Sequence, residues 1–399
     1  MKILWVNSNF MHPSTKGGTI RTLEMLLHLH RRHEIHYAAI ENPAQPEGPA
    51  RAHEYSFRSY SVRHAVPERG SAAFAGQIVT ALFSRLPLAM KRFHSPGLGR
   101  LLEELIRQEH FDRAVVDHLT PASYYPDLAH SVLFQHNVET VIWQRHAEHA
   151  ADPLRRLYFR LQARRMEEFE RRVCRAVSHV VAVSPVDARA MRELFAIEHI
   201  SEIPTGVNIE YHAPPPSVPH FADLAFVGSM DWLANVDGVT WFVEEVLPLI
   251  RRRKPGCTLG IIGRTPPASI QEMARRDPAI FVTGTVPDVR PYLWGSAISI
   301  VPLRIGGGTR LKIYESMAAR VPVVSTTIGA EGLVVNPGEN CRIADTARDF
   351  AGQCVDLLDD PAARARLADA AWQMVSERFS WEVVARCFEC ILEAAGGAG

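Results

Sequence analysis

Cysteine is scarce in this chain, and its start lacks the features of an export signal. Only six cysteines occur among 399 residues, all from Cys174 onward. The opening string MKILWVNSNF has one lysine and a short apolar run, which is typical of a first β-strand and not of a signal peptide. We therefore expect a cytoplasmic protein with reduced thiols. The lone C-x-x-C pair, Cys387 and Cys390, lacks the two further ligands that a zinc site needs, so we predict that it packs in the core.

Long apolar runs and an excess of one charge sign are absent as well. The stretch AAFAGQIVTALFSRLPLAM is interrupted by Arg85 and Pro87, and a membrane span needs roughly 20 apolar residues. Lysine plus arginine and aspartate plus glutamate both number 44. This balance gives no support for the strongly basic domain typical of nucleic-acid-binding proteins, so we expect no nucleic-acid partner. A hydrophobic content of 47% and this length indicate a globular chain of two domains.

An alternation of strands and helices occurs twice along the chain. In the first half we expect strands in KILWVNSN, EIHYAAI, RAVVDHL, SVLFQHNVE and VSHVVAVSP, with helices near 72–92, 96–109, 152–176 and 186–195. After the proline-rich string IEYHAPPPSVPHFAD, the strands DLAFVGSM, CTLGIIGR, IFVTGTV, AISIVPL, VPVVSTTIG and GLVVNPG follow, separated by helical stretches. The pattern predicts an α/β fold of two doubly wound, Rossmann-like domains that face a cleft.

The domain boundaries follow from the same pattern. We expect an N-terminal domain over 1–208, a stiff proline-rich linker over 209–222 and a second domain over 223–375. The closing segment, 376–399, contains an amphipathic helix that no strand follows. This helix must therefore dock on a domain that is already built.

The string GGGTRLKIYES, residues 306–316, lies between an apolar strand and a helix. Glycines let backbone N–H groups approach an anion, and a helix N-terminus adds about half a positive charge. Arg310 can fork two phosphate oxygens, Lys312 adds a point charge, and Glu315 can accept hydrogen bonds from sugar hydroxyls. We interpret the string as a cradle for a diphosphate; the alternative is a flexible loop with a surface Lys–Glu pair. Its loop residues are Gly306, Gly307, Gly308 and Thr309.

Two weaker signals lie in the first half. Gly17 and Gly18 open a helix that carries Arg21, but no G-x-G-x-x-G fingerprint occurs in the chain, so the pair is either an anion-facing loop or a tight turn. His118 and His136 each end an apolar strand, where a parallel sheet presents its functional groups. The alternative for both is a histidine of the core or of a loop.

The expected helix over 152–176 is rich in arginine. Eight arginines lie between Arg155 and Arg175. At about 100° per residue, five of them share one face, opposite three apolar residues: Arg156, Arg160, Arg164, Arg171 and Arg175, against Phe159, Met166 and Val173. The face is either solvated or contacts anionic lipid or a polyprenyl-diphosphate acceptor at a membrane surface.

Taken together, these strings resemble family 4 glycosyltransferases, the retaining enzymes of GT-B architecture that transfer a sugar from a nucleoside diphosphate. The resemblance covers essentially the whole length. It rests on the N-terminal GG loop, DH after a mid-domain strand, IPTGVN, FVGSM, GTVPDVRPYLWGSAISIVPL, GGGTRLKIYESMAARVPVVST and RFSWEVVA. Within the family the chain is most similar to enzymes of bacterial exopolysaccharide clusters.

The resemblance implies roles for single residues on the donor side. Glu315 matches the glutamate that holds the nucleotide ribose, and the loop around Val286 and Asp288 matches the segment that meets the base through backbone groups. Gly228, within FVGSM, is expected beside the donor, together with the 306–309 loop.

Further roles are implied in the N-terminal domain. Gly17 and Gly18 match the loop near the donor diphosphate, and His118 matches the histidine near the donor sugar and acceptor. Arg21 and His136 are then candidates for the acceptor side. The final helix around Trp381 is expected to cross back onto the N-terminal domain.

Two departures from the family pattern stand out. Where the family often has an arginine and a lysine after the strand FVGSM, this chain has Ser229, Met230 and Asn235. We interpret Arg310 and Lys312 as the replacement for that charge. The first glutamate of the family's pair, which contacts the donor sugar, aligns with Gly307.

The expected reaction is transfer of a hexose from a UDP- or GDP-sugar to a glycan or lipid-linked acceptor hydroxyl, with retention, in exopolysaccharide or cell-surface glycan synthesis. His118, Arg310 and Lys312 would carry the catalysis. No D-x-D-type metal pair stands out, so we expect neither a metal nor another cofactor. Peripheral contact with the inner face of an anionic membrane is one of the two alternatives for the arginine-rich helix, beside a solvated face. The alternatives are a catalytically silent sugar-nucleotide-binding partner and a GT-B nucleotide-sugar epimerase.

Overall fold

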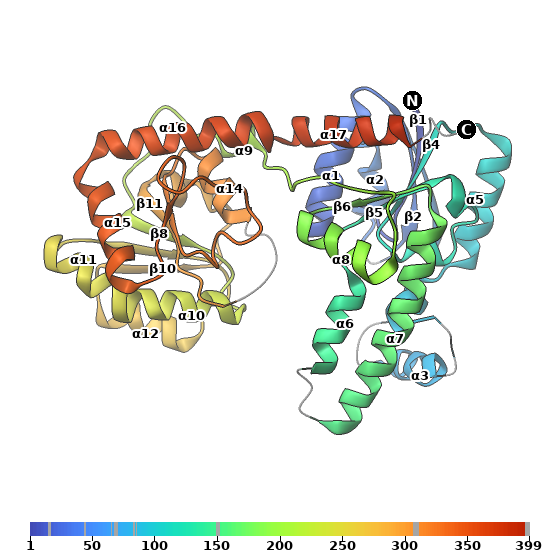
Figure 1. Ribbon diagram of the computed structural model, residues 1–399, viewed down its shortest axis with the longest axis horizontal. Helices are drawn as coiled ribbons and strands as arrows, with labels where there is room; N and C mark the ends of the chain where they lie inside the picture. The colour runs from blue at the N-terminus through green and yellow to red at the C-terminus, as the bar shows by residue number, and fades with distance from the viewer. Residues whose placement is uncertain are drawn as a thin grey trace. The chain divides into compact units, whose positions relative to one another are not determined.

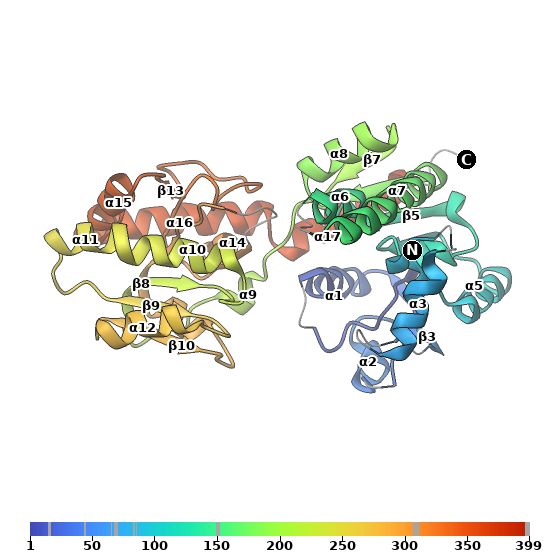
Figure 2. The same cartoon turned by 90° about the horizontal axis from the view of Figure 1, so that it is seen from below.

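The computed structural model describes residues 1–14, 17–43, 45–64, 66–67, 71–82, 84, 86–148, 152–305 and 311–395. The chain divides into two compact units, each with its own parallel sheet (Figures 1 and 2). Unit 1 comprises Met1–Pro204 and Val384–Gly399, and unit 2 comprises Thr205–Val383. The predicted α/β architecture with two doubly wound sheets is confirmed.

Among the described residues, unit 1 has seven parallel strands in the order β3-β2-β1-β4-β5-β6-β7. They are β1 (Lys2–Val6), β2 (Glu34–Glu41), β3 (Arg58–Arg63), β4 (Arg113–Asp117), β5 (Ser131–Gln135), β6 (His179–Ala182) and β7 (Ile200–Glu202). The central strand β1 is buried on both faces, since its side chains from Ile3 to Val6 have no exposed surface. Continuous apolar strands of this kind are expected where helices cover both faces of a parallel sheet.

The helices of unit 1 begin at recognisable capping residues. They are α1 (Gly17–His30), α2 (Glu47–Ala50), α3 (Ala72–Leu82), α4 (Leu88–Phe93), α5 (Pro96–Gln108), α6 (Glu139–Glu148), α7 (Pro153–Ala176) and α8 (Pro185–Phe195). Ser95, Asp152 and Ser184 cap α5, α7 and α8, each followed by a proline in the first turn. The single helix predicted over 72–92 is wrong: Pro87 has an extended backbone and separates α3 from α4.

The last helix, α17 (Trp381–Ala394), docks on unit 1 as predicted. The ring of Phe388 lies 5.6 Å from the ring of Trp5 and 5.1 Å from that of Phe134, centroid to centroid. Arg113 Nε donates a hydrogen bond of 2.6 Å to the carbonyl of Leu392. The prediction that the C-x-x-C pair packs in the core is wrong, because both thiols of this helix are exposed and the face of Phe388 is the buried one.

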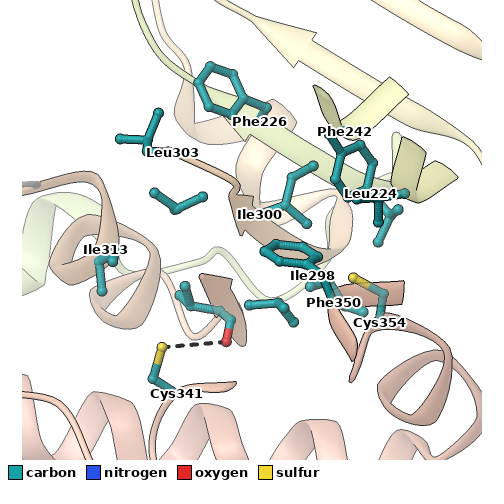
Figure 3. Packing of buried hydrophobic residues seen from close by; sticks show 14 of the residues in the cluster. Leu224, Phe226, Phe242, Ile298, Ile300, Leu303, Ile313, Cys341, Phe350 and Cys354 are labelled. Atoms are coloured by element: carbon teal, nitrogen blue, oxygen red, sulfur yellow. Dashed lines mark hydrogen bonds between the residues drawn. The ribbon is translucent and has the colours of Figure 1, made fainter. Parts of the chain in front are cut away.

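The described part of unit 2 has six parallel strands in the order β10-β9-β8-β11-β12-β13. They are β8 (Ala222–Val227), β9 (Leu259–Ile262), β10 (Ile280–Gly284), β11 (Ser296–Val301), β12 (Val323–Ser325) and β13 (Arg342–Ile343). Figure 3 shows the core on one face of this sheet, where Phe242 and Phe350 pack beside Leu224 and Ile298. The buried Cys341 thiol is directed at a backbone carbonyl, that of Val323, at 3.7 Å.

Helices flank this second sheet. They are α9 (Ile209–His212), α10 (Leu233–Trp241), a π-helical stretch (Phe242–Val246), α11 (Leu247–Arg253), α12 (Ala268–Arg276), α13 (Arg290–Trp294), α14 (Leu311–Ala318), α15 (Ala347–Asp359) and α16 (Pro361–Arg378). The predicted strand GLVVNPG is not a strand. Its amides bond to side chains instead of a neighbouring strand: Val334 N donates to Tyr314 Oη and Asn336 N to Asn340 Oδ1.

The segment 209–222 begins as the short helix α9 and lies within unit 2. Its carbonyls at Tyr211 and His212 accept hydrogen bonds from Arg290 and Trp294 of α13. No helix in the described ranges is long and apolar enough to cross a membrane.

Candidate functional site

Strand β1, the loops that follow β1 and β5, and helix α1 bring polar side chains to Asp117, the last residue of β4. The Asp117 carboxylate is fully buried and accepts four hydrogen bonds. Its Oδ2 accepts from Trp5 Nε1 (3.0 Å), Asn7 Nδ2 (2.6 Å) and Thr22 Oγ1 (2.8 Å), and its Oδ1 accepts from His136 Nε2 (2.8 Å). Burial alone would raise the pKa of this carboxyl, but His136 and the other donors bring it down to about 2. Asp117 is therefore an ionised anchor for the surrounding side chains.

The two histidines predicted at strand ends lie face to face. The rings of His118 and His136 have centroids 3.8 Å apart and planes 20° apart. Arg21 Nη1 lies 3.4 Å from His136 Nδ1, and because a guanidinium can only donate, this Nδ1 is the acceptor. The proton of the neutral ring is therefore on Nε2, which donates it to Asp117. Burial, followed by the charge of His136, lowers the pKa of His118 to about 3, and burial also lowers the pKa of His136. Both rings are neutral at pH 7.

The glycine pair lies beside these rings. Helix α1 begins at Gly17, and a Cβ added at Gly18 would lie 3.4 Å from His118 Cε1 and 3.7 Å from His136 Nδ1. These are ordinary contact distances, so the start of α1 lies beside the ring pair, and a small side chain at position 18 would touch both rings. Burial lowers the pKa of Arg21 to about 10, and this cation stays charged at neutral pH. The structure thus brings together Gly18, Arg21, His118 and His136.

The same residues could be mistaken for a metal centre. One ligand atom each of Asp117, His118 and His136 lies within 4.8 Å of the others. However, both carboxylate oxygens already accept hydrogen bonds, and the Arg21 guanidinium lies against His136 Nδ1. A metal ion would have to displace these donors and would face the charge of Arg21. The chemistry of this cluster fits a hydrogen-bonded network better than a metal site.

Sequence reasoning missed a buried glutamate on the arginine-rich helix. Glu170 of α7 accepts hydrogen bonds from Gln135 Nε2 (2.9 Å), Thr140 Oγ1 (2.6 Å) and the backbone N–H groups of Glu139 (3.1 Å) and Thr140 (2.8 Å). It thereby caps the start of α6 and fixes the loop that follows His136. Burial, with the neighbouring Glu170 charge, raises the pKa of Glu139 to about 7.

In unit 2 the loops after β8 and β9 meet beside α14. Gly263 lies so close that a Cβ there would be 1.8 Å from the carbonyl oxygen of Gly228, so only glycine fits. Lys312 Nζ from the first turn of α14 donates to Asn235 Oδ1 at 3.0 Å and lies 4.4 Å from the centre of the Phe226 ring. A Cβ at Gly228 would come within 2.6 Å of this ammonium. The Lys312 charge is therefore held at the carboxyl end of β8.

A second cation lies at the same loop and was not predicted. Arg264 follows β9, and its Nε donates to Ser229 Oγ at 2.8 Å, while its carbonyl accepts from Met230 N at 2.9 Å. The guanidinium lies 3.4 Å from the Asp231 carboxylate, and both side chains are about half exposed or more. The turn over residues 228–231 thus lies next to two cations, Arg264 from the loop after β9 and Lys312 from α14.

Of the remaining residues predicted to bind the donor, Glu315 lies close to Lys312, and five others lie outside the residues that the structure describes. Glu315 is partly buried one turn after Lys312; burial raises its pKa and Lys312 opposes the shift. Among the described residues its carboxylate has no hydrogen-bond or ion-pair partner. The predicted residues Gly306, Gly307, Gly308, Thr309 and Arg310 lie outside the described residues.

The predicted base-binding loop connects β10 to α13. Val286 is partly exposed there, and Asp288 is paired with Arg290, whose Nε and Nη2 donate to both carboxylate oxygens at 2.7–3.0 Å. This hydrogen-bonded pairing lowers the pKa of Asp288. Because the Arg290 guanidinium also stacks 3.7 Å above the Tyr211 ring, the loop is fixed to α9.

Both halves of the chain match models of known protein families. Residues 15–211 match the family model described as Glycosyltransferase Family 4, and residues 222–360 match the model described as Glycosyl transferases group 1. This chain belongs to glycosyltransferase family 4.

The family 4 chain is similar to characterised and uncharacterised relatives. It is 26% identical over 168 residues to an uncharacterised 44.6 kDa protein in the cps region of Klebsiella pneumoniae, which covers 40% of this chain and 43% of that protein. The chain thus spans about two fifths of the length of the first curated relatives that it matches.

Solved structures show the GT-B fold of this chain. Sucrose-phosphate synthase from Thermosynechococcus elongatus has a TM-score of 0.65 at 16% identity, with 100% of both chains covered. HepE from Anabaena, solved in complex with UDP, has a TM-score of 0.65 at 13% identity, with 99% of this chain and 100% of that chain covered.

In this family 4 chain, the sequence predicted only one of the two cations beside the turn over residues 228–231, namely Lys312. The two cations usual after FVGSM are absent from the sequence there, yet Lys312 and Arg264 lie around the same turn. The glycine–arginine dipeptide at the end of GIIGR, behind a buried strand, was the signal that could have identified Arg264.

Proposed function

We propose that this protein transfers a hexose from a UDP- or GDP-sugar to a hydroxyl of a glycan or lipid-linked acceptor, with retention at the anomeric carbon. The observation that carries the proposal is the pair of cations, Lys312 and Arg264, around the glycine turn at the carboxyl end of β8. Parallel α/β sheets bind ligands at this edge, and a diphosphate is the ligand that two cations and a glycine turn suit.

On the donor side, Lys312, Arg264 and Arg310 would neutralise the diphosphate. The turn at Gly228 and the 306–309 loop would offer backbone N–H groups. Glu315 would accept hydrogen bonds from the ribose, since its carboxylate is partnered by no other described residue. The loop at Val286 would meet the base through backbone groups.

In unit 1, His118 would orient the donor sugar and the acceptor, with Gly17 and Gly18 near the donor diphosphate and Arg21 and His136 toward the acceptor. The acceptor oxygen would attack the anomeric carbon as the bond to the phosphate oxygen breaks, and the leaving phosphate would take the acceptor proton. A neutral His118, with a pKa of about 3, suits an orienting role and not a proton shuttle at pH 7. Fixed cations that face the leaving group would supply most of the rate enhancement, so no divalent metal is required.

The biological setting is proposed on the relatives. HepE has been solved with UDP and with UDP-glucose, which supports a uridine donor, and the Klebsiella relative lies in a cps region, which supports a role in exopolysaccharide or cell-surface glycan synthesis. We place the reaction at the cytoplasmic face of the cell membrane, where a polyprenyl-diphosphate-linked acceptor would be found.

A thermal-shift series with UDP, GDP and ADP tests donor binding. A bound diphosphate stabilises the protein by about 2.7 kcal/mol at a hundredfold excess over Kd. We expect one nucleotide to raise the Tm of the wild type by several degrees and to have little effect on Arg310→Ala/Lys312→Ala. The pair Arg275→Ala/Arg276→Ala, on the exposed face of α12, is the matched control. If no nucleotide stabilises the wild type, the proposal is wrong.

One departure supports a second candidate function. Gly307 stands where the family has the glutamate that contacts the donor sugar, which favours a protein that binds the nucleotide without turning it over. Such a protein would give the same thermal shift but would release no UDP or GDP in the presence of donor sugar and an acceptor-containing membrane extract.

A further inference from the structure

The outward face of α7 carries three exposed leucines. Leu154, Leu157 and Leu161 are 78%, 66% and 37% exposed, and their spacing of three and four residues puts them on one side of the helix. The opposite side, with Ala163 and Met166, is buried. Single exposed apolar side chains are common on protein surfaces, but a stripe of three on one helix is typical of an interaction surface.

Arginines flank this stripe along the first half of the helix. Between Pro153 and Met166, α7 contains five arginines and no aspartate or glutamate: Arg155, Arg156, Arg160, Arg164 and Arg165. The acidic residues of α7 begin only at Glu167, so the first half of the helix is cationic. Asp152, just before it, is occupied as the helix cap, Glu148 lies at the end of α6, and Glu168 forms an ion pair with Arg164 at 3.1 Å.

The neighbouring helices α3 and α4 add a further exposed apolar side chain and two basic ones. Figure 1 shows α3 and α6 beside the first half of α7, at the end of unit 1 that extends away from the sheet. Arg165 of α7 hydrogen-bonds the carbonyl of Ala81 in α3, where Val79 is 57% exposed. The helices α3 and α4 contribute Lys91 and Arg92 and no acidic residue.

We propose that this surface, defined as Leu154, Leu157 and Leu161 with Arg156, Arg160 and Arg164, docks on an anionic phospholipid bilayer. An apolar stripe flanked by arginines is the pattern of a helix that lies in the membrane interface, with leucines among the acyl chains and guanidinium groups at the lipid phosphates. The five arginines of this stretch outnumber the Glu168 carboxylate that pairs with Arg164, and the remaining positive charge favours anionic lipid over a neutral partner. The inference deepens the proposed function, since it rests on a lipid-linked acceptor.

Vesicle flotation of the full-length protein tests the surface. We expect the wild type to float with phosphatidylcholine vesicles that contain phosphatidylglycerol, and to float poorly with phosphatidylcholine alone or at high salt. Arg156→Gln/Arg160→Gln/Arg164→Gln should weaken binding about fivefold per arginine, and Leu154→Ser/Leu157→Ser/Leu161→Ser should weaken it at least about tenfold.

Two control variants make the same kinds of substitution at other places in the chain. Arg252→Gln/Arg275→Gln/Arg276→Gln removes three exposed arginines of unit 2, and Phe57→Ser removes an exposed apolar side chain at the start of β3; neither should alter flotation. Equal loss in the arginine control, full binding by the leucine variant, or no flotation of the wild type would each overturn the proposal. Concentration-dependent dimerisation that the leucine variant abolishes, without vesicle binding, would identify a second copy as the occupant and overturn it too.

The nucleotide-induced thermal shift is measured on the same variants. Because these side chains are exposed, we expect the shift to be retained, which also shows that the variants are folded. Loss of flotation with an intact nucleotide-induced shift would show that the substitutions remove membrane docking and leave nucleotide binding unchanged. A wild type that floats but shows no nucleotide-induced shift would contradict the proposed function and leave the docking surface supported.

Discussion

At the residue scale, Asp117 determines the state of its neighbours. It holds His136 in one tautomer, and that ring stacks on His118. The positive φ of 69° at His118 is uncommon for a residue other than glycine, and it turns the chain directly after β4. Strain of this kind is retained where the surrounding contacts over-determine the backbone, and here the buried network does so.

The lowered pKa values of the two histidines predict how stability depends on pH. A histidine whose folded pKa lies below its unfolded value of about 6.5 binds more protons when unfolded, so stability is lost as the pH falls below about 6.5. We expect the free energy of unfolding to fall by at most about 1.4 kcal/mol per pH unit for His118 between pH 6.5 and 4, and His136 adds a loss in the same direction. Urea denaturation at several pH values measures this slope, and His118→Asn should reduce it. A slope that the substitution leaves unchanged would show that His118 is not the titrating group.

Arg264 is predicted to contribute to nucleotide binding although it lies on a different strand from the family's usual cations. Arg264→Ala removes a cation and leaves the Asp231 carboxylate facing the diphosphate, so we expect UDP or GDP to bind about tenfold more weakly. Isothermal titration measures the change. Asp231→Asn is the matched control and should bind at least as tightly as the wild type. Equal affinity of Arg264→Ala and wild type would remove Arg264 from the donor site.

At the element scale, Glu170 joins α7 to the loop after β5. Glu170→Gln keeps the shape but replaces a carboxylate that accepts four hydrogen bonds, so we expect a loss of about 1–3 kcal/mol in stability. Urea denaturation measures the loss, and the Glu139 and Thr140 amides should exchange hydrogen faster. Glu168→Gln, on the exposed side of the same helix, should change neither quantity. Unaltered exchange at Thr140 in Glu170→Gln would contradict the capping role.

Elements were more predictable than the contacts between them. The apolar runs identified β1, β4, β5, β8 and β11, because strands buried on both faces need continuous apolar residues. Helical periodicity also placed Met166 and Val173 on the side of α7 opposite the arginines, and both side chains are buried. Glu170 was missed because a charged residue is normally read as exposed, and only the tertiary fold supplies its four donors. Arg264 was missed because its role depends on Ser229, which is distant in sequence.

At the scale of the whole molecule, unit 1 is completed by the end of the chain. Removing Val384 to the C-terminus would take Phe388 from between Trp5 and Phe134, and an aromatic core side chain contributes about 3–5 kcal/mol. We expect the truncated protein to be cleaved in unit 1 by limited proteolysis while unit 2 still gives a nucleotide-induced thermal shift. Cys387→Ser/Cys390→Ser, on the exposed side of α17, should behave as wild type. Resistance of the truncated unit 1 to protease would show that α17 is dispensable for its core.

The docking of α17 also has a consequence for synthesis on the ribosome. Unit 1 emerges first, but about 180 residues separate Pro204 from the Val384 segment that completes its core. At 5–20 residues per second, the nascent unit 1 waits roughly 10 to 40 s with the surface around Trp5 and Phe134 uncovered. Unit 2, in contrast, is contiguous in sequence and can close as soon as it is translated. The first unit to be made is therefore the last to be finished, and it is the one that most needs protection from aggregation during translation.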